Sequence, residues 1–210
     1  MSAKEEILGR IRSALADAPA AEEVPREYRT SSDMSEEQLI EMLVDRLVDY
    51  KAGVDVIDAA QIPDFVAAKL GKAASVVYPH GLDTVWLSAL PQGIARRIDT
   101  PGARLSVAEL DETSAVVTSS AVSIAESGTI ILDGEPDQGR RAISLVPDHH
   151  VCIVPVSTIV QLLPEAMPRL TVTRPLTWIS GPSATSDIEL ERVEGVHGPR
   201  VLDVLLVRGL

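Results

Sequence analysis

Apolar residues near the N-terminus recur at helical spacing, which predicts a short amphipathic helix. Ser2 and Glu5 have the spacing of a capping box, in which each side chain accepts a hydrogen bond from the other residue's backbone N–H. The apolar face consists of Ile7, Leu8, Ile11 and Leu15. Residues 17–33 carry prolines and scattered charges without an apolar period, so we expect a linker there. We therefore predict a tethered helix over residues 1–33 and an α/β domain over residues 34–210.

From Ser35 onward, short apolar runs alternate with helical stretches, which is typical of βαβ units around a largely parallel sheet. Ser35 and Gln38 predict the capping box of a second helix, which we expect to end at Gly53. The first half predicts strands at 54–57, 74–78 and 105–107, and helical pieces at 62–70, 84–90 and 93–97. The second half predicts strands at 115–118, 121–125, 129–132, 142–146, 151–154, 176–180 and 201–207, with helical turns at 158–163 and around Pro164 and Pro168. The fold class is α/β, with a mostly parallel sheet that mixes in antiparallel strands.

Composition and charge narrow the functional classes. Hydrophobic residues make up 45% of the 210 residues and aromatic residues only 3%, so the core must be built from aliphatic side chains. A net charge of −12 repels phosphate backbones and anionic lipids, and we expect no nucleic-acid partner. A single cysteine cannot hold an iron–sulfur cluster or form an internal disulfide. Without a long apolar run or a signal-peptide core, we expect a cytoplasmic protein with no membrane insertion.

The segment 178–188 has the residue types of a ligand-binding loop. A predicted buried strand leads into a turn rich in glycine and hydroxyl groups, and then into a predicted helical turn. In α/β sheets such a junction lies at the carboxyl edge, so we expect the loop there, where N–H and hydroxyl groups bind anions. The alternative is a hydroxyl-rich turn that only caps a short helix. The ligand-binding candidates are Ser180, Gly181, Ser183, Thr185, Ser186 and Asp187.

Two further loops offer acid–base groups. Glu126 precedes Gly128 and Thr129 between two predicted strands, where a carboxylate could act as nucleophile, base or ligand anchor. The alternative is an exposed hairpin glutamate beside a glycine that supplies positive φ. His197 and Arg200 lie in a loop with two glycines and a proline, either as an acid–base and anion-binding pair or as a structural turn.

The loop 133–141 contains two arginines, Arg140 and Arg141, which could contact an anionic ligand; the favoured alternative is a solvated turn with local salt bridges. His149 and His150 are adjacent on a predicted strand and point to opposite faces, so we expect no metal site there. Cys152 lies in an apolar strand and is expected to be buried. The sequence lacks the glycine-rich dinucleotide and P-loop fingerprints, and it identifies no cofactor.

An ordered series of motifs in the second half carries a family resemblance. The motifs are AESGT at 125–129, LDG at 132–134, DQGRRA at 137–142, LVPDHH at 145–150, PLTWISGPSATSDIE at 175–189 and VEGVHGPR at 193–200. Together they resemble the lactate utilization protein C family, of the LUD-domain type. The first 110 residues match that family only in general layout.

The resemblance implies a three-layer α/β/α sandwich similar to the sugar-phosphate isomerase and coenzyme A transferase superfamily. It also implies a part in the oxidation of L-lactate to pyruvate, together with iron–sulfur partner proteins. The single cysteine fits the component without clusters. By analogy with coenzyme A transferases, Glu126 is a candidate nucleophile, His197 a candidate acid or base, and Arg140 or Arg200 a partner for a carboxylate.

Three functional hypotheses follow. The first is a non-cluster component of a lactate-oxidising system that binds a small anionic ligand at the 180–187 loop. The second is a stand-alone enzyme of acyl, coenzyme A or phosphosugar chemistry that uses Glu126. The third is a regulatory or assembly module whose N-terminal helix docks on a partner or forms a homo-oligomer.

Overall fold

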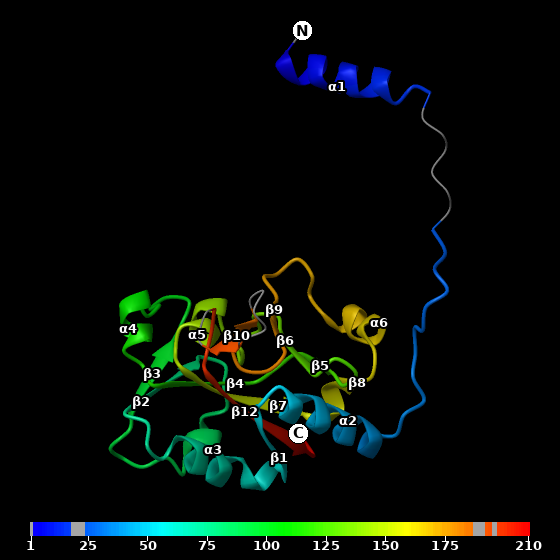
Figure 1. Ribbon diagram of the computed structural model, residues 1–210. Helices are drawn as coiled ribbons and strands as arrows, with labels where there is room; N and C mark the ends of the chain where they lie inside the picture. Colours follow the sequence, from blue (N-terminus) through cyan, green and yellow to red (C-terminus); the bar gives the residue numbers. More distant parts are fainter. Residues whose placement is uncertain (1, 18–23, 187–191, 195–196) are drawn as a thin grey trace.

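A parallel six-stranded sheet forms the centre of the computed structural model, which describes residues 2–17, 24–186, 192–194 and 197–210 (Figure 1). Its strand order is β1-β12-β7-β4-β2-β3, and every neighbouring pair is parallel. The strands are β1 (Gly53–Asp58), β2 (Ser75–Pro79), β3 (Ala95–Asp99), β4 (Ala115–Thr118), β7 (His149–Pro155) and β12 (Val201–Arg208). The predicted α/β class is confirmed.

The antiparallel strands lie in two smaller sheets rather than in the central one. A four-stranded sheet has the order β8-β5-β6-β9, with antiparallel β5–β6 and β6–β9 pairs. Its strands are β5 (Val122–Ile124), β6 (Thr129–Leu132), β8 (Ile159–Val160) and β9 (Thr177–Ile179). A separate antiparallel pair consists of β10 (Ala184–Ser186) and β11 (Arg192–Glu194).

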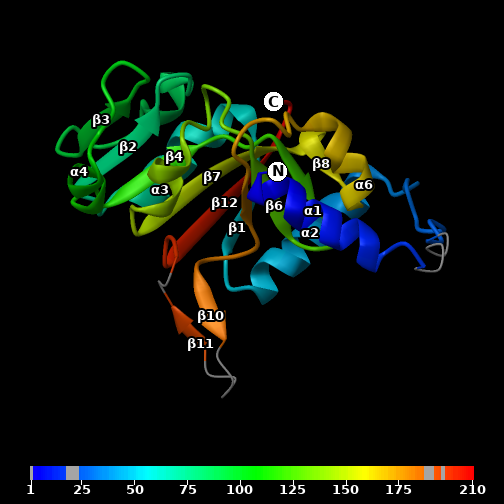
Figure 2. The same cartoon turned by 90° about the horizontal axis from the view of Figure 1, so that it is seen from above.

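Two outer layers cover the faces of the central sheet (Figures 1 and 2). Helix α3 (Ile62–Leu70) and the 3-10 turn η2 (Thr84–Leu87) pack on one face. The other face meets α2 (Glu36–Asp49), the four-stranded sheet, α4 (Val107–Asp111) and α5 (Arg141–Leu145). The shorter elements are η1 (Ala59–Gln61), η3 (Val156–Thr158), α6 (Leu163–Ala166) and η4 (Met167–Arg169). The molecule is therefore three-layered, with one outer layer built from helices and strands together.

Helix α1 (Ala3–Ala14) stands apart from these layers in Figure 1 and buries none of its residues. The predicted capping box of Ser2 and Glu5 is present, and the predicted apolar face is exposed. The segment after residue 23 returns to the body, where Arg29 forms an ion pair with Glu126 (2.6 Å) and the Ser32 amide donates to Glu165 (3.0 Å). None of the helices in the described ranges is long and apolar enough to cross a membrane.

Helix α2 begins at the predicted capping box but ends before Gly53. Lys51 adopts φ 67°, and the amides of Lys51 and Ala52 bond to Val48 and Leu47, which is a Schellman motif. Gly53 instead begins β1. A Cβ at Gly53 would lie 2.2 Å from a carboxylate oxygen of Asp203, so the glycine allows the two strands' side chains to fit.

Four of the elements predicted between residues 93 and 163 are wrong in type. Residues 93–97 lead into the edge strand β3. Most of its positions are exposed, so the alternation of apolar and polar residues that is typical of a strand is missing from its sequence. The predicted strand at 105–107 is replaced by a capping box of Ser106 and Glu109 that begins α4. Residues 142–146 form α5, because a single turn buries Ile143 against the sheet. The predicted helix at 158–163 contains β8, because its β-branched residues pair with β5.

A charged cluster crosses the amino-terminal half of the central sheet on its α3 face. The carboxylate of Asp203 in β12 lies 2.7 Å from His149 Nε2 of β7 and 2.9 Å from Lys69 Nζ of α3. Lys69 also lies 2.8 Å from Asp55 of β1. Burial pushes the pKa of Asp203 up, but hydrogen bonds and charge from His149 and Lys69 outweigh it, so the pKa is lowered. The cluster joins three strands and a helix.

We expect Asp203→Asn to lower the free energy of unfolding by about 2 kcal/mol at pH 7, because Lys69 and His149 lose a charged acceptor. The lowered pKa means that this stabilisation is present above the unfolded pKa of about 4 and is lost as pH falls through the folded pKa. Urea unfolding at pH 7 and at progressively lower pH measures the difference. Glu41→Gln, at an exposed position of α2, is the control; an equal effect of both variants would contradict the role of the cluster.

Candidate functional site

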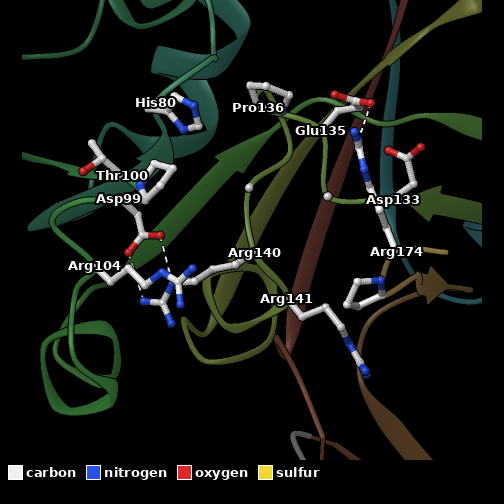
Figure 3. Close-up of a pocket in the computed structure, with 14 residues that line it drawn as sticks. His80, Asp99, Thr100, Arg104, Asp133, Glu135, Pro136, Arg140, Arg141 and Arg174 are labelled. Atoms are coloured by element: carbon white, nitrogen blue, oxygen red, sulfur yellow. Dashed lines mark hydrogen bonds and ion pairs between the residues drawn. The ribbon is translucent and has the colours of Figure 1, made fainter. Parts of the chain in front are cut away.

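A cavity of about 350 Å³ lies at the carboxyl edge of the central sheet, where β2 and β3 end (Figure 3). The loop that follows β6 crosses this edge and supplies half of the lining. The lining residues are His80, Asp99, Thr100, Pro101, Arg104, Asp133, Gly134, Glu135, Pro136, Gly139, Arg140, Arg141, Arg174 and Pro175. The volume is near the lower end of the range for small-molecule sites.

Close backbone contacts hold the 133–141 loop against the strand ends. The Gly81 amide donates to the Pro136 carbonyl at 2.9 Å, and a Cβ at Gly81 would lie 2.4 Å from the proline ring. Gly139 has φ +72°, and a Cβ there would lie 2.8 Å from Pro79 at the end of β2. The buried side chain of Gln138 accepts the Asp133 amide at 2.7 Å. The loop is therefore held in place both by a hydrogen bond within it and by contacts with the residues at the end of β2.

An ion pair between Asp99 and Arg140 closes one wall of the cavity. Both oxygens of Asp99, at the end of β3, accept guanidinium N–H groups at 2.9 Å. Arg140 also donates to the Leu105 carbonyl (2.5 Å), and the Leu105 amide donates to Asp99 (2.9 Å). Asp99 is only 5% exposed. Burial pushes its pKa up, but hydrogen bonds and charge from Arg140 and the Leu105 amide outweigh it and lower the pKa.

Two other arginines of the cavity lack such partners. Arg104 and Arg141 form no hydrogen bond or ion pair through their guanidinium groups with any residue that the structure describes. Arg174 is paired with Glu135. In the view of Figure 3, Arg104 lies beside the Asp99–Arg140 pair, and the side chain of Arg141 extends downward, away from that pair and from Arg174. The cavity thus offers two guanidinium groups to a ligand.

A second cavity, of about 230 Å³, lies at the amino-terminal ends of β7 and β12. Its lining contains Ser180, Gly181, Ser183 and His197, which are four of the predicted site residues. His150 also lines this cavity; it is 1% exposed and its Nε2 lies 2.8 Å from Thr118 Oγ1. Burial lowers the pKa of His150 to about 3, so this ring is neutral. No lysine or arginine lines this cavity within the described parts of the chain.

Hydroxyl groups near the second cavity bond to the protein itself. Thr129 Oγ1 lies 2.8 Å from both Ser180 Oγ and Ser127 Oγ. Ser183 Oγ accepts the His197 amide at 3.0 Å, and the Ser183 amide donates to the Pro199 carbonyl at 2.8 Å. These bonds join the loop after β9 to the hairpin before β6 and to the segment before β12.

The expected place of the hydroxyl-rich loop is wrong. Strand β9 belongs to the four-stranded sheet, so the loop after it does not lie at the carboxyl edge of the parallel sheet. Thr185 and Ser186 are in strand β10, where we had expected a helical turn. Asp187 lies outside the described residues. Gly181 adopts φ +85° and packs against Tyr50 at the end of α2.

Two other predicted residues take part in surface ion pairs. Glu126 is paired with Arg29, lines neither cavity and lies next to Gly128, whose φ of +63° brings it against Arg46. Arg200 binds Asp148 through two hydrogen bonds of 2.6 and 2.9 Å, and both side chains are largely exposed. The structure therefore does not bring Glu126 and His197 into one cavity.

The two histidines point to opposite faces of β7, as predicted: His149 bonds to Asp203 and His150 to Thr118. Within the described ranges, no group of three or more metal-binding side chains is present. Cys152 is buried as predicted, and burial raises its pKa to about 12, so the thiol stays protonated. A buried thiol that stays protonated does not have the surroundings of a reactive cysteine.

Comparison with known proteins identifies the family. The LUD domain model matches residues 53–207. The chain belongs to the LUD domain family. A Deinococcus radiodurans protein named lactate utilization protein C is 45% identical over 209 residues, covering 98% of this chain and 95% of its own length. A Bacillus velezensis protein of the same name is 28% identical over 200 residues, covering 86% and 83%.

A solved structure agrees with the fold. The crystal structure of a DUF162 family protein from Deinococcus radiodurans matches with a TM-score of 0.69 and 38% sequence identity, covering 83% of this chain and 99% of that chain. The predicted family is therefore confirmed, and helix α2 packs into the core of the LUD domain although it precedes the matched range.

Sequence reasoning found the arginines of the 133–141 loop but missed the residues that face them. Asp99 and Arg104 come from the end of β3 and the loop after it, and Arg174 comes from the segment before β9; β3 itself was assigned in part to a helix. The arginine pair following a glycine was the available signal. The residues that face these arginines could not be predicted, because they depend on which strand ends lie side by side in the folded protein.

We expect Arg140→Ala to lower the free energy of unfolding by about 3 kcal/mol, because Asp99 would remain buried without a counter-ion. Denaturant unfolding at pH 7 measures this loss. Arg174→Ala is the matched comparison, because its pair with Glu135 is exposed, and it should cost about 0.5 kcal/mol. Similar losses for both variants would show that the Asp99–Arg140 pair does not hold the wall of the cavity.

Proposed function

We propose that this LUD domain protein takes part in lactate utilization and binds a small organic anion in the cavity at the carboxyl edge of the sheet. The observation that carries the proposal is the pair of guanidinium groups, of Arg104 and Arg141, that line the cavity without a partner among the described residues. Guanidinium groups bind carboxylates and phosphates with directed hydrogen bonds. The names of the relatives supply the pathway.

The charge distribution supports this choice of cavity. The whole chain has a net charge of −12, yet this cavity is lined by four arginines and three acidic residues. A local excess of positive charge in an acidic protein favours an anionic ligand over a neutral one. The second cavity offers hydroxyl groups and the neutral ring of His150, and no arginine or lysine among its described lining residues, so it suits an anion less well.

The redox step of lactate oxidation belongs, in this proposal, to iron–sulfur partner proteins. The chain has one cysteine, and that thiol is buried and protonated. A single such residue cannot hold a cluster. The role that remains for this chain is to bind the organic acid and present it to the partner. Glu126 is not needed for that role, and its exposed pair with Arg29 gives the stand-alone enzyme no supporting geometry.

We expect titration calorimetry to detect binding of an organic acid such as L-lactate or pyruvate to the wild-type protein. Replacing both Arg104 and Arg141 by alanine should weaken that binding at least tenfold, since both guanidinium groups would be lost. The fold should be unaffected, because neither side chain bonds to a described residue. Arg169→Ala, which removes an exposed charge outside both cavities, is the control. Unchanged affinity in the double variant would refute the anion site.

A second role is favoured by helix α1, whose apolar face is exposed although short isolated helices are only marginally stable in water. We propose that α1 docks on another protein chain, either a second copy of this protein or an iron–sulfur partner. Deleting residues 1–16 should leave the melting temperature unchanged, because α1 buries no residue in its own chain. Light scattering and pull-down should then show weaker association; unchanged association would exclude this role.

A further inference from the structure

The second cavity contains a buried histidine that the protein bonds on one side only. His150 of β7 lines this cavity and is 1% exposed, and its Nε2 atom lies 2.8 Å from Thr118 Oγ1. The other ring nitrogen, Nδ1, forms no hydrogen bond with any residue that the structure describes. The unbonded side-chain atoms that the described protein encloses completely are Asp55 Oδ2, Ser123 Oγ and Asp133 Oδ1. Nδ1 is not one of them, so it remains open to the cavity.

A chain of hydrogen bonds fixes which nitrogen of His150 carries the proton. The chain ends at the Ser119 carbonyl, which can only accept, so the Cys152 thiol donates to it (3.9 Å). Thr118 Oγ1 in turn donates to Cys152 Sγ (3.9 Å), and His150 Nε2–H donates to Thr118 Oγ1. Because burial lowers the pKa of His150 to about 3, the ring is neutral and has this single proton. Nδ1 is therefore a hydrogen-bond acceptor without a donor.

Thr177 of β9 adds a hydroxyl group to the same cavity. Thr177 is 6% exposed and lines the cavity, and its Oγ1 forms no hydrogen bond with a described residue. Two other hydroxyl groups of the lining are already bonded. Ser180 is bonded to Thr129, and Ser183 accepts the His197 amide. The cavity thus offers a ligand an imidazole acceptor and a threonine hydroxyl, and buried polar groups of this kind are almost always bonded.

The rest of the lining favours an uncharged ligand. The described lining residues include no lysine, arginine, aspartate or glutamate. A charged ligand would lose its hydration there without gaining a counter-ion, which is unfavourable. Apolar side chains supply much of the wall, namely Leu145, Ile179, Pro182, Pro199 and Leu202. The volume of about 230 Å³ suits one small ring system, because drug-sized ligands occupy larger sites.

We propose that the second cavity binds an uncharged planar ring with an N–H donor, as in nucleobases and aromatic amides, and that this N–H donates to His150 Nδ1. The apolar faces of the ring contact the walls, and Thr177 Oγ1 bonds to its polar edge. The inference does not rest on the proposed anion site, because the two cavities have no described lining residue in common. It gives the chain a second ligand of different chemistry.

Two matched sets of rings test the inference by titration calorimetry. The first set is benzamide, acetophenone and benzoate, which carry an N–H donor, a methyl group and a negative charge on one skeleton. The second set is 9-methyladenine and 9-methylpurine, of which only the first has an N–H donor. We expect the donor of at least one set to bind tenfold or more tightly than its analogue, because a site built to bond an N–H rejects a ligand that lacks it.

Trp178 reports where the ring binds. The chain has two tryptophans, and only Trp178 lines the second cavity, whereas Trp86 lines neither cavity. In a Trp86→Phe background, the fluorescence of Trp178 should therefore change as benzamide or 9-methyladenine binds. Binding without a change in this fluorescence would place the ring elsewhere and contradict the inference.

Variants of the two unbonded groups test their roles. His150→Gln should abolish the preference for the N–H donor, because glutamine can still donate to Thr118 but has no acceptor at the place of Nδ1. His150→Asn, whose side-chain oxygen can replace Nδ1, should keep part of the preference. Thr177→Val should weaken binding of the preferred ring by about threefold or more, because a hydrogen bond is lost at nearly constant side-chain size. Thr171→Val, at an exposed position outside both cavities, is the control.

The outcomes separate this inference from the anion site. If no ring of either set binds, if the N–H donor has no advantage, or if benzoate binds most tightly, the inference is wrong and the anion site stands. If His150→Gln melts like the wild-type protein and keeps the full preference, Nδ1 is not the acceptor and the inference is wrong. If the His150 variants do not fold, Thr177→Val decides, and an affinity equal to that of Thr171→Val overturns the inference.

Discussion

The ion pair of Asp99 and Arg140 is the interaction on which the carboxyl edge of the sheet depends. It joins the end of β3 to the loop that leaves β6, and these belong to different sheets. Because Asp99 is buried, its charge requires a counter-ion, so the arginine loop must lie across the strand ends. Gly139 makes this possible, since its φ of +72° and lack of a side chain let the loop contact Pro79. The cavity is lined by the residues that this ion pair joins, at the end of β3 and in the 133–141 loop.

The two ends of the central sheet differ in how their charges are satisfied. Near the amino ends, Asp203 is bonded to both His149 and Lys69, and this cluster connects three strands and a helix. At the carboxyl edge, among the described residues, Asp133 Oδ1 is buried without a hydrogen-bond partner, and the guanidinium groups of Arg104 and Arg141 form no hydrogen bond or ion pair, although the charge of Arg104 helps to lower the pKa of Asp99. A fold normally satisfies such groups internally, and in the proposed function the two guanidinium groups are those that an external ligand would contact.

The sequence predicted the elements whose signal is local. The capping boxes at Ser2 and Ser35 begin α1 and α2 as expected, and the apolar run at 201–207 lies within β12 at the centre of the sheet. The edge strand β3 was missed, because only one of its faces is covered and its residues are good helix formers. The placement of the hydroxyl-rich loop failed for a topological reason: an apolar run such as 176–180 does not reveal which sheet it joins, and β9 pairs with β6.

Residue type alone therefore could not show which of the two cavities is the better candidate for an anion site. The hydrogen-bond partners of the lining residues distinguish them. The loop 180–183 has the hydroxyl groups of an anion site, but Ser180 is bonded to Thr129 and Ser183 to the His197 amide. Groups already bonded within the protein gain little from a ligand, because binding exchanges one hydrogen bond for another. From sequence, the arginines of the 133–141 loop favoured a solvated turn with local salt bridges over a ligand site. In the structure Arg140 is bonded to Asp99, whereas the guanidinium group of Arg141 forms no hydrogen bond or ion pair with a described residue, and both line the cavity at the carboxyl edge. This cavity is therefore the one chosen for the proposed anion site, because a ligand there would add bonds that the protein itself does not make.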